Sequence, residues 1–341
     1  MKDINPKQKV AILRILRDAR EPIGSAAIAD ELRTYGFDLS GRTIRLYLQK
    51  MEEEGFVTSA RRGREGGRSI TPLGQEEIHD ALVTDRVGFM ASKVDELAYQ
   101  VTFDLAAKKG TIVLNLTLID AVTLPSAVRC MIPIFEAGMG MGEYVTVIQE
   151  GEQLGEFYVP AGKVGIGTVC SVTLNGILLN SGIPVVSLFG GVLEIDEERP
   201  ARFTDVIHYA GTSLDPLEIF IKGKLTSVRD VARSGHGRIG CSFREVPSVS
   251  LPQVRKIRRQ MQDIKLDGIM MMGKPNQALL GFPVEEGRSA FVVTGGLNPT
   301  SAIEEAGIST TNHALCTMFE FENLFHYSKL TDVVERDFKN V

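Results

Sequence analysis

The pattern of apolar and polar positions in the first eighty residues predicts three helices followed by two short strands. The run Val10-Ala-Ile-Leu-Arg-Ile-Leu16 places apolar side chains on one helical face. We expect Ser25 to cap a second helix and Ser40 to cap a third, because a serine oxygen accepts backbone N–H bonds at such a position. Glu54-Gly-Phe-Val57 and Ile70-Thr-Pro-Leu-Gly74 then bracket a basic loop. This order predicts a winged helix-turn-helix and therefore DNA binding.

The polar face of the third helix and the basic loop carry the side chains expected to contact DNA. In the helix these side chains lie opposite Ile44, Leu48 and Met51, where they can reach base edges and phosphates from the major groove. The loop holds four arginines within eight residues, and its glycines let the backbone approach a phosphate or the minor groove. A solvated helix face beside a flexible charged loop is the simpler alternative. The predicted DNA-binding residues are Ser40, Arg42, Thr43, Arg45, Gln49, Lys50, Arg61, Arg62, Arg64 and Arg68.

A helical connection is expected over residues 76–108, between a winged helix at residues 1–75 and the rest of the chain. Helical spacing of apolar residues resumes after Pro72 and continues from Val83 to Leu97. This segment either links the domains or forms a dimer contact, since winged-helix proteins usually bind paired half-sites.

Residues 109–330 alternate β-branched runs with helical segments, and they repeat themselves weakly. Leu124-Pro and Leu251-Pro each follow an expected strand, and Thr173-Leu-Asn-Gly176 resembles Gly296-Leu-Asn-Pro-Thr300, at an offset of about 125 residues. We predict an α/β chain (α+β overall): an N-terminal winged helix-turn-helix followed by an internally duplicated α/β regulatory domain, with halves at about 109–230 and 231–330. Chance similarity is the alternative. A true duplication would place a ligand cleft between two related lobes.

Loops rich in glycine and hydroxyl side chains supply the candidates for a ligand site. Gly165-Ile-Gly-Thr-Val-Cys-Ser171 leads into an expected helix, and its counterpart is Val293-Thr-Gly-Gly-Leu-Asn-Pro-Thr300. Helix N-termini offer N–H groups that favour carboxylates or phosphates. Turn formation alone is the alternative for each loop. The predicted ligand-binding residues are Thr168, Cys170, Ser171, Thr173, Asn175, Tyr209, Gly211, Thr212, Ser213, Thr294, Asn298 and Thr300, with Lys163 and Arg129 as weaker cationic candidates.

Composition limits the class of protein. An apolar fraction of 43% and a charged fraction of 24% are typical of globular proteins, and a net charge of −5 requires any DNA-binding charge to be local. Without a long apolar run or a signal-peptide core, we expect a cytoplasmic protein that makes no membrane contact. The four cysteines lack paired metal spacing, and a site from His313 and Cys316 is a minor alternative. Lacking a nucleophile elbow, a P-loop or a His-Glu-x-x-His motif, the chain is predicted to be no enzyme and to need no cofactor or metal.

Taken together, these motifs resemble one known family. The winged helix with Ser40-Gly-Arg-Thr-Ile-Arg-Leu-Tyr-Leu48, the Gly165–Ser171 loop, Leu188-Phe-Gly-Gly191 and Tyr209-Ala-Gly-Thr-Ser-Leu-Asp-Pro216 are similar to the nitrogen-regulatory repressor NrpR of archaea and some bacteria. The resemblance covers nearly the whole chain. It implies a homodimeric repressor on double-stranded operator DNA whose regulatory domain senses 2-oxoglutarate, so that this effector releases nitrogen-assimilation genes. This chain has one regulatory domain, whereas some members carry two.

Two other functions remain open from the residues alone. A winged-helix regulator that senses another effector, such as an amino acid, a nucleotide or an oxidant, would have the same domain order. An enzyme with an attached DNA-binding module would need a positioned acid, base or nucleophile. In a dimeric sensor, the ligand would alter the separation of two recognition helices, which must match half-sites about 34 Å apart or a multiple of that distance.

Overall fold

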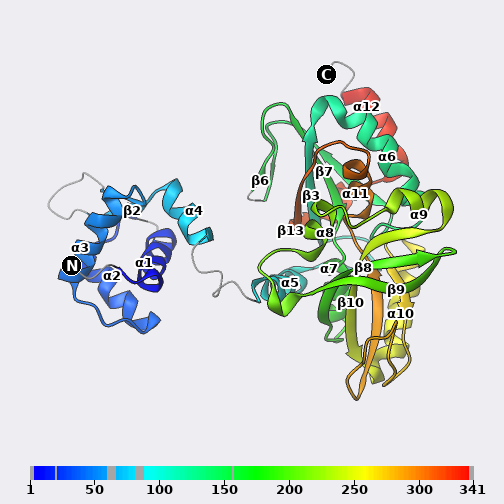
Figure 1. The fold of residues 1–341 in the computed structure, drawn as a ribbon, viewed down its shortest axis with the longest axis horizontal. Helices are drawn as coiled ribbons and strands as arrows, with labels where there is room; N and C mark the ends of the chain where they lie inside the picture. Colours follow the sequence, from blue (N-terminus) through cyan, green and yellow to red (C-terminus); the bar gives the residue numbers. More distant parts are fainter. Residues whose placement is uncertain (1–3, 20, 60–66, 81–87, 156, 338–341) are drawn as a thin grey trace. The chain divides into compact units, whose positions relative to one another are not determined.

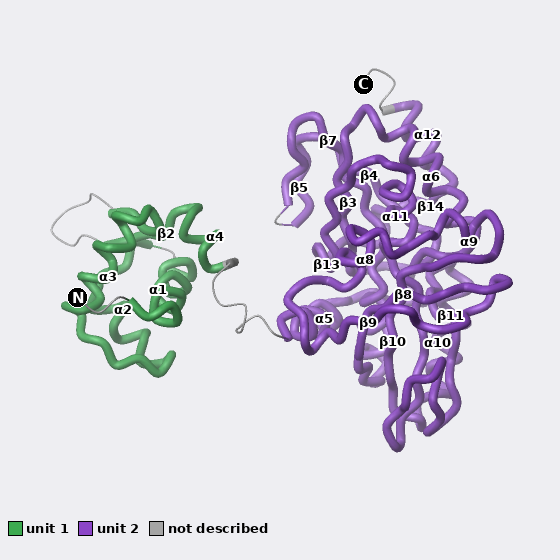
Figure 2. The backbone as a smooth tube through the Cα atoms, viewed as in Figure 1, with its two compact units in different colours: residues 1–86 green, residues 87–341 purple. Residues whose placement is uncertain are grey.

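The computed structural model describes residues 4–19, 21–59, 67–80, 88–155 and 157–337. The chain divides into two compact units, residues 1–86 and 87–341 (Figures 1 and 2). The smaller unit consists of α1 (Pro6–Asp18), α2 (Ser25–Leu32), η1 (Arg33–Tyr35), α3 (Gly41–Glu53), β1 (Val57–Ser59), β2 (Arg68–Ile70) and α4 (Pro72–Asp80). The antiparallel pair β1–β2 follows the three helices, so the predicted winged helix-turn-helix is confirmed.

Local sequence explains where the helices of the smaller unit begin. Pro6 stands at the start of α1, and the Ser40 side chain caps α3 by accepting the Thr43 N–H at 3.2 Å. The expectation for Ser25 is wrong: Gly24 is the N-cap of α2, no side chain caps it, and Ser25 is the first helical residue. Buried apolar faces of α1, α2 and α3 then meet in one core.

The predicted connecting segment, residues 76–108, is divided between the two units. Helix α4 packs on α1 through an ion pair between Lys9 and Glu77, at 2.9 Å. Helix α5 (Phe89–Gln100) instead buries Met90, Val94 and Leu97 in the larger unit. Val83 lies outside the described residues. Each described helix therefore serves the core of its own unit, because each has an apolar face that a neighbouring element covers.

The larger unit contains the same series of elements twice. The first is β3 (Thr111–Asp120), η3 (Ala121–Thr123), α6 (Leu124–Glu136), β4 (Tyr144–Ile148), β7 (Lys163–Val169), α7 (Val172–Asn180) and β8 (Val186–Asp196). The second is β10 (Gly237–Pro247), η5 (Ser248–Ser250), α10 (Leu251–Asp263), β11 (Ile269–Met272), β12 (Arg288–Thr294), α11 (Asn298–Glu305) and β13 (Thr311–Glu320). The internal duplication is confirmed in this β-α-β-β-α-β order.

The two copies exchange their last strands. One sheet has the order β13-β3-β7-β4-β14 and the other β11-β12-β10-β8-β9, and every named strand pair is antiparallel. Strand β8 of the first copy thus pairs with β10 of the second, while β13 of the second pairs with β3 of the first. A boundary near residue 230 divides the sequence but not the structure, because each sheet needs a strand from the other copy.

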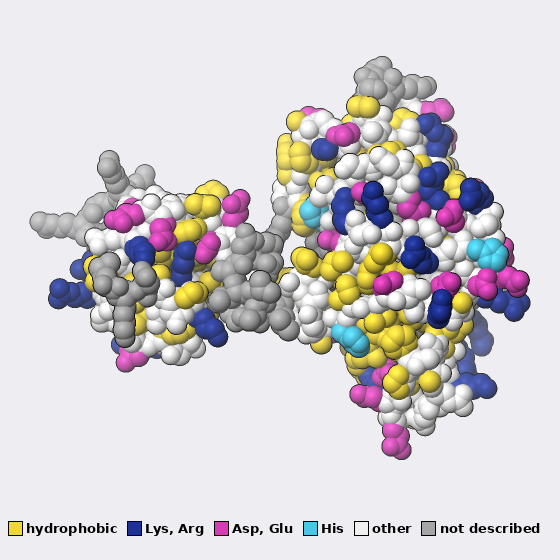
Figure 3. All heavy atoms as spheres, viewed as in Figure 1, with side chains coloured by type: hydrophobic (Ala, Val, Ile, Leu, Met, Phe, Trp, Pro, Cys, Tyr) yellow, Lys and Arg dark blue, Asp and Glu magenta, His cyan; other side chains and the backbone are white. Residues whose placement is uncertain are grey.

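Further elements extend this frame. They are the hairpin β5 (Gln153–Leu154) and β6 (Phe157–Tyr158), the edge strands β9 (Arg199–His208) and β14 (Phe325–His326), η4 (Tyr209–Gly211), α8 (Pro216–Lys222), α9 (Val228–Ser234), η6 (Phe321–Asn323), η7 (Tyr327–Lys329) and α12 (Leu330–Asp337). Phe189 and Phe243 of the second sheet stack on each other, and both rings contact those of Phe203 and Phe282. Figure 3 shows hydrophobic side chains gathered over the lower part of the larger unit, where Figure 1 draws β9 and β10.

Equivalent hydrogen bonds fix the register of the two copies. The Thr173 hydroxyl bonds both the N–H and the carbonyl of Val113, and the Asn298 amide bonds both groups of Gly240. Thr173 and Asn298 therefore occupy matching places, each tying the start of a helix to the first strand of its copy. The motif alignment of Thr173–Gly176 with Gly296–Thr300 pairs Asn175 with Asn298 and is wrong by two positions. Such short motifs do not determine at which residue each helix begins.

Gly176 allows α7 to approach the segment that follows α5. A Cβ atom there would lie 2.3 Å from the Val101 Cβ and 2.8 Å from the Ala98 carbonyl oxygen. We expect Gly176→Ala to destabilise the larger unit by about 1–3 kcal/mol through overpacking, lowering Tm by roughly 2–4 °C for each kcal/mol. Gly211→Ala is the steric control, since no atom lies within 4 Å of its added Cβ. Calorimetry of both variants tests this packing, and equal melting temperatures would contradict it.

Candidate functional site

One face of α3 presents polar side chains in the pattern required for a recognition helix. Arg42, Arg45 and Gln49 are exposed at successive helical turns, opposite the buried Ile44 and Leu48. No ion pair or hydrogen bond engages the side chains of Arg42 and Arg45 within the described part of the smaller unit. Their guanidinium groups are therefore available for a DNA phosphate or a guanine edge.

Leu46 belongs to the same face and was missed from the sequence. Its side chain is 48% exposed, one helical turn after Arg42. An exposed apolar side chain beside these arginines suits contact with a thymine methyl group. Helical spacing could have identified Leu46, since positions 42, 45, 46 and 49 share one helical face.

The remaining predicted DNA contacts have varied surroundings. The Ser40 and Thr43 hydroxyls lie 2.9 Å apart within the cap of α3, and Lys50 is partly buried. Arg68 pairs with Glu52 at 2.9 Å, and its contact with DNA stays a prediction. Arg61, Arg62 and Arg64 lie outside the described residues.

A buried polar cluster joins the two copies of the larger unit. Arg244 on β10 is 1% exposed, and its Nη1 donates to the Ser171 carbonyl oxygen at 2.7 Å and to Asn175 Oδ1. Its Nη2 donates to Ser171 Oγ at 2.6 Å, while Asn175 Nδ2 donates to Ser187 Oγ at 3.0 Å. We call Arg244, Ser171, Asn175 and Ser187 the Arg244 cluster. Its cation comes from the second copy and all its acceptors come from the first.

A β-bulge sets the position of Arg244. Phe243 lies opposite Phe189, but the register shifts so that Arg244 lies opposite Ser187. A bulge re-aims a side chain by bending its strand. The Arg244 side chain thereby reaches the N-terminal turn of α7, whose residues from Val172 to Leu178 are all buried.

No carboxylate neutralises Arg244 among the described residues. No ion pair involves its guanidinium, and its buried Nε has no hydrogen-bond partner. Burial lowers the pKa of Arg244, raises the pKa of Cys170 to about 11 and also raises the pKa of Tyr209. The nearby thiol and phenol are thus uncharged at neutral pH. A buried cation without an anion is unfavourable, and this makes the cluster attractive to an anionic group.

A small cavity lies beside the cluster. Its volume is about 10 Å³, room for one water molecule, and its lining includes Cys170, Ser171, Tyr209 and Asp215. Asp215 caps α8, with Oδ1 accepting from the Leu217 and Glu218 N–H groups. Asp215 lies in the turn from Tyr209 to Pro216 and is not one of the predicted site residues. Its distinguishing property is its burial, which the sequence motif does not reveal.

Most other predicted ligand residues hold the backbone together. Thr173 and Asn298 tie helices to strands, Thr294 donates to the Met139 carbonyl oxygen at 2.6 Å, and Thr300 bonds its own helix. The Thr168 hydroxyl is buried without a partner. The turn 211–213 closes on itself through Thr212 and Leu214, with no bond to the Arg244 cluster. The groups with such bonds support the fold, and contact of these residues with a ligand stays a prediction.

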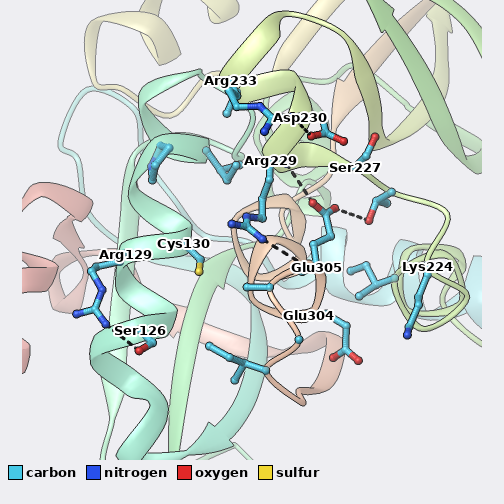
Figure 4. A pocket seen from close by; sticks show the side chains of 18 of the residues that line it. Ser126, Arg129, Cys130, Lys224, Ser227, Arg229, Asp230, Arg233, Glu304 and Glu305 are labelled. Carbon is cyan, nitrogen blue, oxygen red and sulfur yellow. Dashed lines mark hydrogen bonds and ion pairs between the residues drawn. The ribbon is translucent and has the colours of Figure 1, made fainter.

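A larger groove lies between α6, α9 and α11. Its volume is about 1180 Å³. Figure 4 shows Arg129 of α6 on one side and Lys224, which follows α8, on the other. The Glu305 carboxylate accepts hydrogen bonds from the Thr226 hydroxyl and from the N–H groups of Val228 and Arg229. No carboxylate pairs with Arg129 or Lys224 within the part of the chain described. Lys163, the other weak candidate, pairs with Asp120 at 2.8 Å on the surface.

The described ranges offer neither a group of metal ligands nor a membrane span. Within them, no three His, Cys, Asp or Glu side chains are grouped to hold a metal ion. His313 packs against the ring of Phe157 instead. None of the helices in those ranges combines the length and apolarity needed to cross a bilayer.

Both units are similar to known proteins. A family model described as NrpR regulatory domains NRD1 and 2 matches residues 87–326, and one described as the ribonuclease R winged-helix domain matches residues 10–78. The chain is 36% identical to the global nitrogen regulator NrpRI of Methanosarcina mazei, over 93% of this chain and 97% of that protein. Global nitrogen regulators NrpR of Methanococcus maripaludis and Methanocaldococcus jannaschii are 28% and 27% identical. The chain spans about half the length of these last two, 51% and 56%.

A solved structure is also similar. It is the crystal structure of a nitrogen repressor-like protein from Methanococcus jannaschii, with a TM-score of 0.59 and 28% sequence identity. The match covers 69% of this chain and 97% of the other.

Asp215 should make stability depend on pH. Burial raises the pKa of Asp215 to about 6, so the folded chain holds this proton more tightly than the unfolded chain does. The contribution of Asp215 to the free energy of unfolding is therefore greatest at low pH. It is lost as pH rises from about 4 through 6, at about 1.4 kcal/mol per pKa unit. Asp215→Asn keeps an N-cap acceptor and removes the titration.

We expect the variant and the parent to be equally stable near pH 4, and the variant to be more stable by about 2–3 kcal/mol near pH 7.5. Denaturant unfolding at several pH values measures the difference. Burial raises the pKa of Glu218 to about 7, and the Asp215 charge adds to this rise, so Glu218 contributes a smaller slope in the variant and adds to its advantage at high pH. A difference that stays constant with pH would contradict this assignment.

Proposed function

Because this chain belongs to the NrpR family of nitrogen regulators, we propose that it is a DNA-binding repressor of nitrogen-assimilation genes that 2-oxoglutarate releases from its operator. The family membership and the winged helix support DNA binding and nitrogen regulation. The effector, the homodimer and a cytoplasmic location are our proposals. We place this protein among regulators rather than enzymes, in keeping with the names of its relatives.

The exposed face of α3 supports the assignment of the recognition helix. Arg42, Arg45, Leu46 and Gln49 combine cationic, amide and apolar groups on one side of a helix. Such a face provides phosphate contacts for position and base contacts for sequence. Two copies in a homodimer would present two such helices to half-sites about 34 Å apart or a multiple of that distance.

The uncompensated charge of Arg244 is the observation that carries the effector proposal. A carboxylate of 2-oxoglutarate would provide the missing anion, and Arg–carboxylate pairing is among the strong hydrogen-bonded contacts in proteins. Ser171, which lines both the cluster and the cavity, would share that carboxylate. The keto group and second carboxylate would then extend toward Cys170 and Tyr209.

Entry of this ligand requires movement between the two copies. The cavity holds only about one water molecule, so a five-carbon diacid must separate α7 from β10. Arg244 and its acceptors belong to different copies, and their separation would change the packing of the exchanged strands. A coupling of about 1–3 kcal/mol between this site and the winged helices would be enough for regulation.

The groove beside α6 supports a second location for the effector. It is already large enough for a metabolite, and Arg129 and Lys224 offer two cations for a dianion. Arg129→Ala combined with Lys224→Ala would abolish the response to 2-oxoglutarate if the effector bound there. An effector other than 2-oxoglutarate would stabilise the protein in a metabolite screen while 2-oxoglutarate did not.

Arg45→Ala is expected to weaken operator binding about 5- to 150-fold, since one good base or phosphate contact contributes about 1–3 kcal/mol. Fluorescence anisotropy with operator DNA selected from random sequence measures this loss. Arg17→Ala is the matched control, because Arg17 lies on α1 and already pairs with Asp18. The stabilisation by 2-oxoglutarate should be unchanged. Normal operator binding by Arg45→Ala would show that α3 is misassigned.

Asn175→Asp places a carboxylate beside Arg244 with almost no change in shape. Asn175 Oδ1 already accepts from Arg244, and the Ser187 hydroxyl can donate to the new oxygen. The variant supplies the anion internally, so we expect Tm without ligand to rise by a few degrees, for a charged hydrogen bond of about 1.5–3 kcal/mol. Both the thermal shift and the release of DNA by 2-oxoglutarate should be lost.

Asn276→Asp controls for the added charge, because Asn276 lies in an exposed loop where its Oδ1 accepts the Gly287 N–H. Its response should match that of the unaltered protein. If Asn175→Asp also kept a full thermal shift with 2-oxoglutarate, the effector would bind elsewhere.

A further inference from the structure

Helix α10 of the larger unit carries a concentrated basic face. Leu251, Val254, Ile257 and Met261 are buried in the core, and the side chains on the other side of the helix point outward. Those outward positions include Arg255, Lys256 and Arg259, all exposed, and none of the three makes an ion pair or hydrogen bond within the described residues. We call Arg255, Lys256, Arg258 and Arg259 the α10 basic face.

The duplicated helix shows that this charge is not required by the fold. Aligning Leu124-Pro with Leu251-Pro places Arg255 at the position of Val128 and Arg258 at that of Met131. Val128 and Met131 are 3% and 0% exposed, and α12 packs on the helix that carries them. The same architecture is therefore stable with apolar side chains at these positions, and the second copy has cations where the first has a covered face.

The α10 basic face also borders a groove. Arg255, Arg258 and Arg259 line it with Gln262 and Met272, and its volume is about 390 Å³. Arg258 forms an ion pair with Asp267 at 3.0 Å. The charges of Arg255 and Arg259 have no such partner among the described residues. Arginine guanidinium groups form paired hydrogen bonds with phosphate oxygens, so the groove suits a chain of phosphates.

We propose that the α10 basic face binds the phosphate backbone of DNA next to the operator. The chemistry of the face favours DNA over an acidic protein. Protein interfaces have apolar or aromatic centres, whereas nucleic-acid interfaces are polar and strongly positive. The exposed residues of α10 are Pro252, Gln253, Arg255, Lys256, Arg259, Gln260, Gln262 and Asp263, with a single acid and no large apolar side chain.

Covalent linkage to the winged helix adds a second argument. Once α3 holds an operator, the larger unit of the same chain stays near that DNA at a high local concentration. A net charge of −5 over the chain would otherwise oppose this approach, so a local cluster of cations is required. This inference rests on the proposed DNA-binding function and adds a second, sequence-independent contact to it.

The salt dependence of operator binding tests the proposal. Full-length protein is titrated by fluorescence anisotropy against operator DNA with long flanks, from about 50 to 300 mM KCl, and log K is plotted against log[KCl]. The triple variant Arg255→Gln, Lys256→Gln, Arg259→Gln should lower the slope by about 0.9 for each phosphate that the helix no longer neutralises, up to about 2.7. On DNA trimmed to the operator core, the variant and the unaltered protein should have the same slope.

The matched control removes three cations elsewhere on the larger unit, by Lys108→Gln, Arg199→Gln, Lys274→Gln. These three side chains are also exposed. The control should keep the slope of the unaltered protein on both DNAs. An equal decrease of slope in the control would show a general charge effect and overturn the proposal.

An unchanged slope in the α10 variant would also overturn the proposal, because the face would then neutralise no DNA phosphate. The unaltered protein distinguishes this result from failure of the proposed function. If it binds the operator specifically while the α10 variant has the same slope, only the α10 contact is wrong. If it shows no specific binding, the proposed function itself fails.

Discussion

The exchange of strands between the two copies is the constraint on which the larger unit depends. Strand β8 completes the sheet of the second copy, and β13 completes the sheet of the first. Removing β13 would expose one edge of the ten-residue strand β3, and removing β8 would expose one edge of the eleven-residue strand β10. The two copies therefore form one cooperative body, although their sequences are separable.

This exchange also creates the polar interior of the unit. Strand β8 brings Ser187 beside Arg244, and the bulge at that point turns the guanidinium toward α7. The acceptors of Arg244 all belong to the first copy, so the cluster lies where the copies meet. The uncompensated charge at this position is the reason that we place the proposed effector at the junction.

The duplication has also allowed the copies to diverge in what they expose. Helices α6 and α10 begin with the same Leu-Pro and pack the same inward face, yet α6 is covered by α12 and α10 carries a row of cations. Likewise, Thr173 and Asn298 use different side chains for the same task. The inward faces follow the shared core, while the outward faces respond to different surroundings. Comparing the two copies separates residues needed for folding from residues available for binding.

The sequence by itself determined the order of the elements. Helical spacing, the Ser40 cap and the glycine-rich basic loop predicted the winged helix, and repeated Leu-Pro motifs revealed the duplication, because these are local signals carried by neighbouring residues. It also placed Ser171 and Asn175 among the ligand candidates. Their roles in ligand binding stay predictions, since the structure shows only that both residues bond Arg244.

Only the tertiary structure decided which of these residues meet. The burial of Arg244 depends on α7, β8 and a bulge, and no local sequence pattern encodes it. Asn298 and Thr294 looked like ligand donors but bond the backbone of distant residues. Likewise, the partition of residues 76–108 between two units follows from which core covers each apolar face. Burial and pairing across long separations are properties of the packed chain, and the spacing of residues cannot reveal them.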